Sequence, residues 1–376
     1  MAAEGTPADR DRSRLVQVLL VIASLLAMVA IFSAWIERQA LDTDEWVETS
    51  AALLEKEEIR TALSQYAVDE LYAEVDVEAD IRRRLPPELK SLASPIAAGL
   101  RSAGQQAADR VLASPRFEGV WEEANRGAHG ELLDIVEDRG PIAERGGAAE
   151  LDLRTLLIEV AQELGLSGKR LEKLPPTVAQ LRIMRADQIE TGQAIASAIK
   201  GIAILTTLGT LLLLAAAIYF AGSRRWAAVL GAGVGLVAAG VIVLILRKIA
   251  GGVVVDSLAS PAAEPAADQA WSVGTSLLRS IAWHVVVLGL LFALAGWLGS
   301  PAESARSARR TIGPVLRDHL AIVIVVLAVP LAIWVLDGAD STRVLLMRLA
   351  LCAFLAVGLA VLHRDAQAEH PGAPAP

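Results

Sequence analysis

An uncharged apolar segment near the N-terminus is followed by 160 mostly polar residues, 36–195, and then by five further apolar segments. This order constrains the fold more than any other feature, because an apolar run of about 20 residues crosses the hydrocarbon core of a bilayer as a helix. The composition agrees, with 54% hydrophobic residues and a mean hydropathy of +0.46. We therefore expect a mainly α fold, in which a helical transmembrane bundle of six spans carries a separate polar domain.

The first apolar segment, 15–35, has 21 residues and no charge, and arginines precede it. A cleaved signal peptide shares the basic start, but its apolar core is usually about 7–15 residues long and precedes an A-x-A type site. This segment is longer and lacks that site, so we interpret it as a retained transmembrane helix. The remaining predicted spans form a five-helix bundle within 201–362, at 201–220, 226–246, 281–299, 320–336 and 344–362.

Arginine and lysine in the short loops predict the orientation, because they are enriched on the cytoplasmic side of membrane proteins. With both termini inside, ten lie in cytoplasmic segments and four in the outer loops. The ten are Arg10, Arg12, Arg14, Arg224, Arg225, Arg306, Arg309, Arg310, Arg317 and Arg364, and the four are Arg247, Lys248, Arg279 and Arg343. We therefore expect cytoplasmic tails at 1–14 and 363–376, the second disordered, and an extracytoplasmic domain at 36–200.

The expected outer domain is acidic. Residues 36–195 hold 31 acidic and 19 basic residues, a net charge of −12, which leaves +4 for the rest of the chain and sums to the total of −8. This charge argues against nucleic acid as a partner and against docking on anionic lipid headgroups. The only cysteine, Cys352, lies in the last predicted span, so no disulfide can stabilise the domain.

Most of the domain shows helical spacing of its apolar residues. A serine N-cap with proline at the first helical position predicts a helix from Ser114-Pro115. Its apolar face comprises Phe117, Val120, Trp121, Ala124, Ala128, Leu132 and Ile135. An earlier helix is expected to bury a stripe of Ile59, Leu63, Tyr66 and Ala67. Alternating apolar and charged residues in 149–154 and 180–185 predict strands, so we expect a mostly helical domain with a small β-sheet.

Short motifs across residues 40–250 resemble those of a known group of proteins. They are Trp46-Val47 with the acids before them, Val111-Leu112 leading to Ser114, Phe117, Trp121, Ala124-Asn125-Arg126, Ala128-His129, Leu151-Asp152-Leu153 and Arg224-Arg225. On these residues the chain resembles a group of uncharacterised actinobacterial multi-pass integral membrane proteins with a large extracytoplasmic domain. The resemblance implies the same topology in the bacterial cytoplasmic (plasma) membrane. It implies no activity.

Trp121, Asn125 and His129 are the candidate site residues of the domain. Asn125 and His129 are four residues apart, so their side chains can meet on one helix face. One interpretation is a polar binding spot beside a Trp–Phe ledge, and the other is a buried hydrogen-bonding pair that fixes helix packing. A single histidine without a nearby cysteine, second histidine or spaced carboxylate is not a metal site.

No motif predicts catalysis, a cofactor or a metal. The acidic residues of 76–80 resemble the start of a calcium loop, but Ile81 stands where an EF-hand needs glycine, and Pro87 where it needs glutamate. The chain contains no G-x-x-x-x-G-K-[ST], H-E-x-x-H or G-x-S-x-G sequence. We therefore expect a protein that is not an enzyme.

Small residues recur at four-residue spacing in the spans, at Gly231, Gly235 and Ala239 and at Gly289 and Ala293. Such spacing allows close approach of two helices, here within one bundle in preference to a dimer face. Lys200, His284 and Arg348 lie near the outer ends of spans, where snorkelling or pairing within the bundle accounts for them.

Two functions from different classes fit these features. The first is a non-catalytic envelope protein whose outer domain binds a partner protein, a lipid or a cell-wall component. The alternative is a transporter or channel with the outer domain as a lid, for which Thr206, Thr207 and Thr210 form the candidate lining. Membrane lipids are partners in either case, and the sequence does not determine an oligomeric state.

Overall fold

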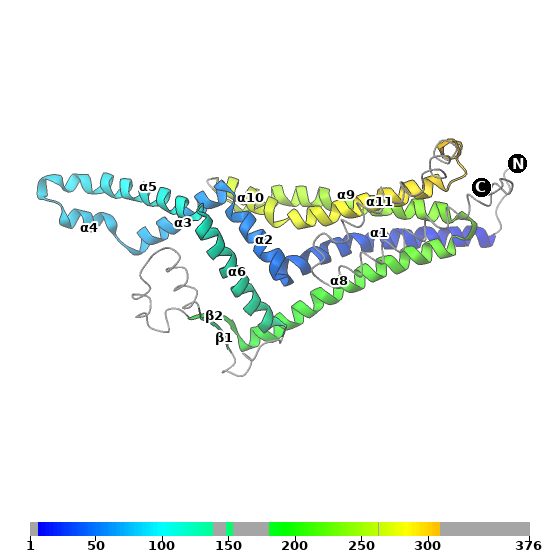
Figure 1. The fold of residues 1–376 in the computed structure, drawn as a ribbon, viewed down its shortest axis with the longest axis horizontal. Helices are drawn as coiled ribbons and strands as arrows, with labels where there is room; N and C mark the ends of the chain where they lie inside the picture. The colour runs from blue at the N-terminus through cyan, green and yellow to red at the C-terminus, as the bar shows by residue number, and fades with distance from the viewer. Residues whose placement is uncertain (1–6, 138–147, 153–179, 262, 309–376) are drawn as a thin grey trace, which may run out of the picture. The chain divides into compact units, whose positions relative to one another are not determined.

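The computed structural model describes residues 7–137, 148–152, 180–261 and 263–308, and every structural statement below concerns these residues (Figure 1). Four long helices dominate them: α1 (Pro7–Leu41), α8 (Ala186–Phe220), α9 (Arg225–Leu258) and α11 (Ser276–Leu298). Leucine, alanine and isoleucine fill these helices, and none has proline in its interior. Such residues keep the helix uninterrupted, because proline would remove a backbone donor.

These helices supply four candidate membrane spans by length and hydropathy: Asp11–Leu41, Glu190–Phe220, Gly222–Ser257 and Ser276–Leu298. They overlap the first four predicted spans and indicate a membrane protein. The predicted spans 320–336 and 344–362, together with the tail 363–376, lie outside the described residues. Gly222 has a φ of +56° in the short turn between α8 and α9, a conformation that glycine adopts without steric cost.

The predicted fold class requires correction. Strands β1 (Ala148–Asp152) and β2 (Gln180–Arg185) overlap the two alternating segments and pair antiparallel with each other. Outside these two strands, 92% of the described residues are helical. A ribbon of two strands has no independent stability, so it forms no sheet layer around which a domain could pack. The fold is helical, with four candidate spans in the described residues in place of the six-span bundle.

One compact unit comprises 7–27, 209–241 and 284–308 among the described residues. Its helices approach closely at glycines: a Cβ at Gly231 would lie 2.8 Å from Leu20 Cδ1, and a Cβ at Gly289 would lie 2.7 Å from Val237 N. A Cβ at Gly235 would collide with the Ser24 side chain. The predicted close approach at these small residues is thus confirmed, and it lies within one chain.

The second unit comprises the described residues of 28–208 and 242–283. It contains the polar helices: α2 (Thr43–Leu54), α3 (Glu57–Glu74), α4 (Val77–Arg84), a short 3-10 helix η1 (Pro87–Leu92), α5 (Ala93–Leu112), α6 (Pro115–Val136) and α10 (Glu264–Gly274). Helix α2 packs on α6, α3 packs on α5, and α10 contacts both α2 and α3. As predicted, α6 begins at Ser114, whose hydroxyl accepts a hydrogen bond from Phe117 N at 3.3 Å.

The buried face of α3 differs from the predicted one. Ser64 and Val68 are buried, whereas Tyr66 is 68% and Leu63 is 39% exposed. The physical reason is that α3 packs on α5 through its Val68 face, where a Cβ built at Gly104 would lie at an ordinary contact distance of 3.7 Å from Val68 Cγ2. The predicted stripe of Leu63 and Tyr66 therefore faces away from the α5 contact.

Candidate functional site

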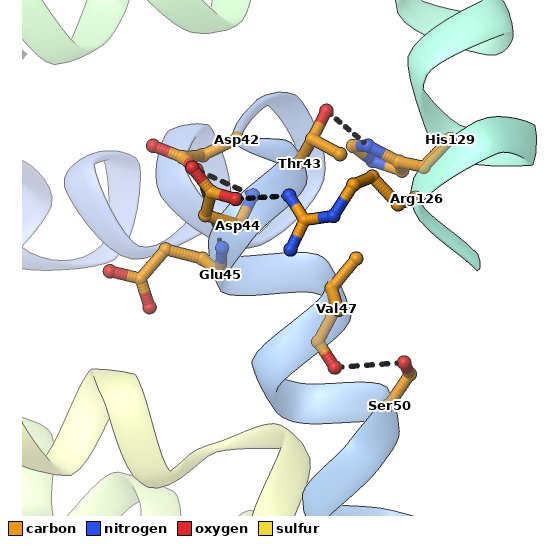
Figure 2. A network of polar contacts seen from close by, with 8 residues as sticks. All are labelled: Asp42, Thr43, Asp44, Glu45, Val47, Ser50, Arg126 and His129. Carbon is orange, nitrogen blue, oxygen red and sulfur yellow. Dashed lines mark hydrogen bonds and ion pairs between the residues drawn. The ribbon is translucent and has the colours of Figure 1, made fainter. Parts of the chain in front are cut away.

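The three candidate residues lie along α6, where this helix packs against α2. Thr43 at the start of α2 contacts His129, and Ser50 near its end contacts Trp121, so the two helices run antiparallel. Asp42 caps α2 by accepting hydrogen bonds from the backbone N–H groups of Asp44 and Glu45, at 3.0 and 3.3 Å. This cap fixes where Thr43 meets α6 (Figure 2).

His129 is buried at this contact, with 4% of its surface exposed. Its Nδ1 lies 3.1 Å from Thr43 Oγ1, and its ring stacks on Trp46 with centroids 5.0 Å apart and planes 12° apart. Burial lowers the pKa of His129 below its ordinary value, and it outweighs a hydrogen bond to the Ala40 backbone and the nearby Asp42 carboxylate, which raise the pKa. The ring is therefore held in its neutral form between α2 and α6 at pH 7.

Trp121 lies two turns before His129 and joins the same helices. Its Nε1 donates a hydrogen bond to Ser50 O at 3.1 Å. Phe117 stacks against the Trp121 ring at a centroid distance of 6.2 Å. The predicted Trp–Phe ledge therefore exists, and its one polar atom is already bonded within the domain.

Asn125 does not complete a pair with His129. Its Nδ2 donates to Trp121 O at 2.8 Å, one turn back along α6, so the amide is directed at its own helix. We expect Asn125→Ala to change the free energy of unfolding by no more than about 0.5 kcal/mol, because such back-bonding contributes little to helix stability. Thermal unfolding of the purified protein in detergent, with wild type alongside, measures the change. A loss of about 2 kcal/mol or more would show that Asn125 has a further partner.

The sequence interpretation missed the residues that α2 contributes. Trp46 stacks on the His129 ring. Thr43 contacts His129, and an exposed ion pair joins Asp44 to Arg126 beside them (Figure 2). Asp42 followed by Glu45 has the spacing of a helix capping box, a signal that could have located the start of α2. No local signal could have paired Thr43 with a histidine 86 residues away.

Beside this contact, α2 and α6 leave an open groove of about 480 Å³. Its lining is Asp44, Val47, Glu48, Ala51, Ala52, Glu55, Glu118, Glu122 and Arg126. A second open groove, of about 510 Å³, lies between the end of α6 and α8, where Lys200 Nζ and Glu137 Oε1 are 2.5 Å apart. Within the described ranges, no group of three or more histidine, cysteine, aspartate or glutamate side chains could hold a metal ion.

The polar residues near the spans are engaged in helix packing. Thr206 of α8 is buried, donates to Ile202 O at 2.7 Å and lies 3.2 Å from Ser33 Oγ of α1. Arg247 of α9 donates to Thr275 Oγ1 at 2.7 Å. Lys200 pairs with Glu137 at the end of α6, outside the predicted bundle, whereas Arg348 lies outside the described residues.

Comparison with known proteins gives no match: no family model, no curated protein and no solved structure matches the chain. The resemblance to actinobacterial membrane proteins therefore stays a prediction. The function has to be argued from the geometry of the chain itself.

Proposed function

We propose that this chain is a non-catalytic membrane protein whose polar helical domain lies outside the cytoplasmic membrane and binds a component of the cell envelope. The observation that carries the proposal is the continuity of α1 and α8. Each is a single helix of 35 residues, about 52 Å long, whereas the hydrocarbon core is about 30 Å thick. Both helices therefore extend past the membrane and hold the polar helices on stiff supports.

The packing between α2 and α6 supports a binding role over a catalytic one. His129, Trp121 and Asn125 each use a side-chain nitrogen inside the domain. What the domain offers to a partner is the open groove beside them, with the side chains of Glu48, Glu122 and Arg126 in its lining. An acidic lining of this kind disfavours anionic lipid headgroups and favours a neutral or cationic partner.

The proposed orientation predicts which residues an impermeant reagent can reach on intact cells. In a Cys352→Ser background, which has no other cysteine, we expect Glu123→Cys on α6 to react with an impermeant maleimide. Ser223→Cys, in the turn between α8 and α9, should react only after the membrane is permeabilised. Both positions are exposed, so a difference in labelling reports sidedness. Labelling of Ser223→Cys on intact cells would overturn the extracytoplasmic assignment.

The binding proposal predicts a photo-cross-link from one face of α6. A photoreactive residue at Glu122, in the groove lining, should give a discrete adduct in intact envelopes. Glu131 is the matched control, because nine residues along a helix place it about 180° away on the opposite face. Glu48→Arg, on the other wall of the groove, should remove the adduct. Equal adducts from positions 122 and 131, or none from 122, would contradict binding at the groove.

The transporter alternative rests on the threonines of α8. Thr206 and Thr210 are buried, at 8% and 6% exposure, and Thr206 hydrogen-bonds within α8 and contacts Ser33 of α1. The Thr206 and Ser33 hydroxyls each donate to a carbonyl of their own helix and pack against one another between α8 and α1. This observation favours a structural role for Thr206 over the lining of a conduit.

A further inference from the structure

The helices α3, α4, η1 and α5 form an arm, defined here as residues 57–112, whose two long helices pack on each other. Figure 1 shows α4 at the end of this arm farthest from α2 and α6. Val68 faces Gly104, and Asp69 forms an ion pair with Arg101, whose guanidinium also lies 5.8 Å from the centre of the Tyr72 ring. The residue numbers of each pair sum to about 171. A constant sum means that α3 and α5 run antiparallel, and it gives the register in which their residues lie level with one another.

This register brings exposed apolar side chains together on the arm. It places Leu71 level with Leu100, and Val75 level with Ile96. Around α3, Leu71 lies about 60° from Val68, which faces α5. Around α5, Leu100 lies about 40° from Gly104, which faces α3. Both rotations have the same sense when each helix is viewed from its N-terminus to its C-terminus. In an antiparallel pair, equal rotational sense means the same face of the hairpin.

We call this set the arm patch: Leu71, Val75, Leu92, Ile96 and Leu100. Its members are between 39% and 58% exposed. A hairpin of two helices cannot bury such a row by itself, whereas a second hairpin laid on it completes a four-helix bundle. Exposed apolar groups that are contiguous in this way mark interaction sites.

We infer that the arm patch binds the arm patch of a second copy of this chain, in parallel orientation. The charge of the arm selects this partner. Helix α3 has five acidic residues and one basic residue, a net charge of −4. Helix α5, which would stack on α3 of the second copy, has one acidic and two basic residues, a net charge of +1.

The two possible twofold arrangements differ in which helices they bring together. A twofold axis along the arm stacks α3 of one copy on α5 of the other, so opposite charges meet. An axis across the arm stacks α3 on α3, so like charges meet. Complementary charge at the rim of an apolar contact fixes its register and orientation. The parallel arrangement also keeps the membrane helices of both copies at the same end of the pair.

The inference goes beyond the proposed envelope binding, because it concerns a different surface and needs no ligand. The test uses the purified full chain in detergent micelles. Light scattering measures the molecular mass of the protein in each sample of a dilution series. We expect wild type to be a dimer and Leu100→Lys to weaken the association about tenfold or more. Tyr66→Lys is the matched control, since Tyr66 is an exposed apolar residue of α3 outside the patch, and it should change the association less than twofold.

Disulfide trapping tests the arrangement itself. In the Cys352→Ser background, differently tagged chains carrying Leu71→Cys or Leu100→Cys are co-expressed and oxidised in the membrane. We expect the mixed product, which joins position 71 of one chain to position 100 of the other, to exceed both homotypic products. A monomeric wild type, or a Leu100→Lys variant that associates as wild type does, overturns the inference. Predominance of the 71–71 product overturns the parallel arrangement, and circular dichroism establishes that each variant is folded.

Discussion

Gly233→Ala is expected to destabilise the packing of α9 on α11 by about 3 kcal/mol. A Cβ at Gly233 would lie 2.6 Å from Gly289 O and closer still to the backbone N of Ala293. Backbone atoms of a helix cannot rotate away as a side chain can, so the two helices have to separate. Unfolding of the purified protein by titration with a denaturing detergent measures the loss.

The control for this change is Gly252→Ala, in the same helix. No atom lies within 4 Å of a Cβ built there, and alanine is a better helix former than glycine by about 1 kcal/mol. The control should therefore be neutral or slightly stabilising. If both variants lost stability equally, the close approach of α9 and α11 at Gly233 would not be the cause.

His129→Ala is expected to cost about 3 kcal/mol of the free energy of unfolding of the polar domain. The substitution leaves a cavity against Trp46 and deprives the Thr43 hydroxyl of its partner. Arg126→Ala, one turn away, removes only an exposed ion pair with Asp44, which solvent screens, and should cost far less stability than His129→Ala. Thermal unfolding monitored by tryptophan fluorescence compares the two, and equal losses would contradict the assigned role of His129.

The burial of His129 also gives the domain a defined dependence on pH. Because the pKa of His129 is lower in the folded state than its ordinary value of 6.5, the unfolded state binds the proton more readily. The contribution of the neutral His129 ring to the free energy of unfolding is complete above pH 6.5. This contribution is lost as the pH falls from 6.5 towards the pKa of His129 in the folded state. The slope in that window is at most about 1.4 kcal/mol per pH unit, and it should be absent in His129→Gln.

The sequence predicted where the helices lie along the chain better than it predicted which faces of them pack together. Apolar runs and the Ser114-Pro115 start located the first four candidate spans and α6, because these signals are local. Periodicity correctly indicated that α3 is a helix, but it could not show that the Val68 face would pack on α5 and leave Tyr66 exposed.

The glycines of α9 show the same limit. Gly231 and Gly235 were recognisable from their spacing, and both meet α1. Gly233 lies between them on another face and meets backbone atoms of α11, which cannot rotate away as the side chains of Leu20 and Ser24 can. A spacing rule identifies one face of a helix at a time, whereas a bundle helix has several neighbours. Burial of His129 was one of the two interpretations that the sequence allowed, but its contacts with the remote Thr43 and Trp46 were out of reach.

The unbroken helix α1 has a mechanical consequence. It runs from Pro7 to Leu41 and ends where Asp42 caps α2, so the polar helices begin at the tip of a lever about 52 Å long. A tilt of about 10° at one end of such a lever displaces the other end by about 9 Å. Changes in bilayer thickness alter the tilt of spanning helices at little energetic cost. A change in bilayer thickness that tilts α1 is therefore expected to displace the start of α2.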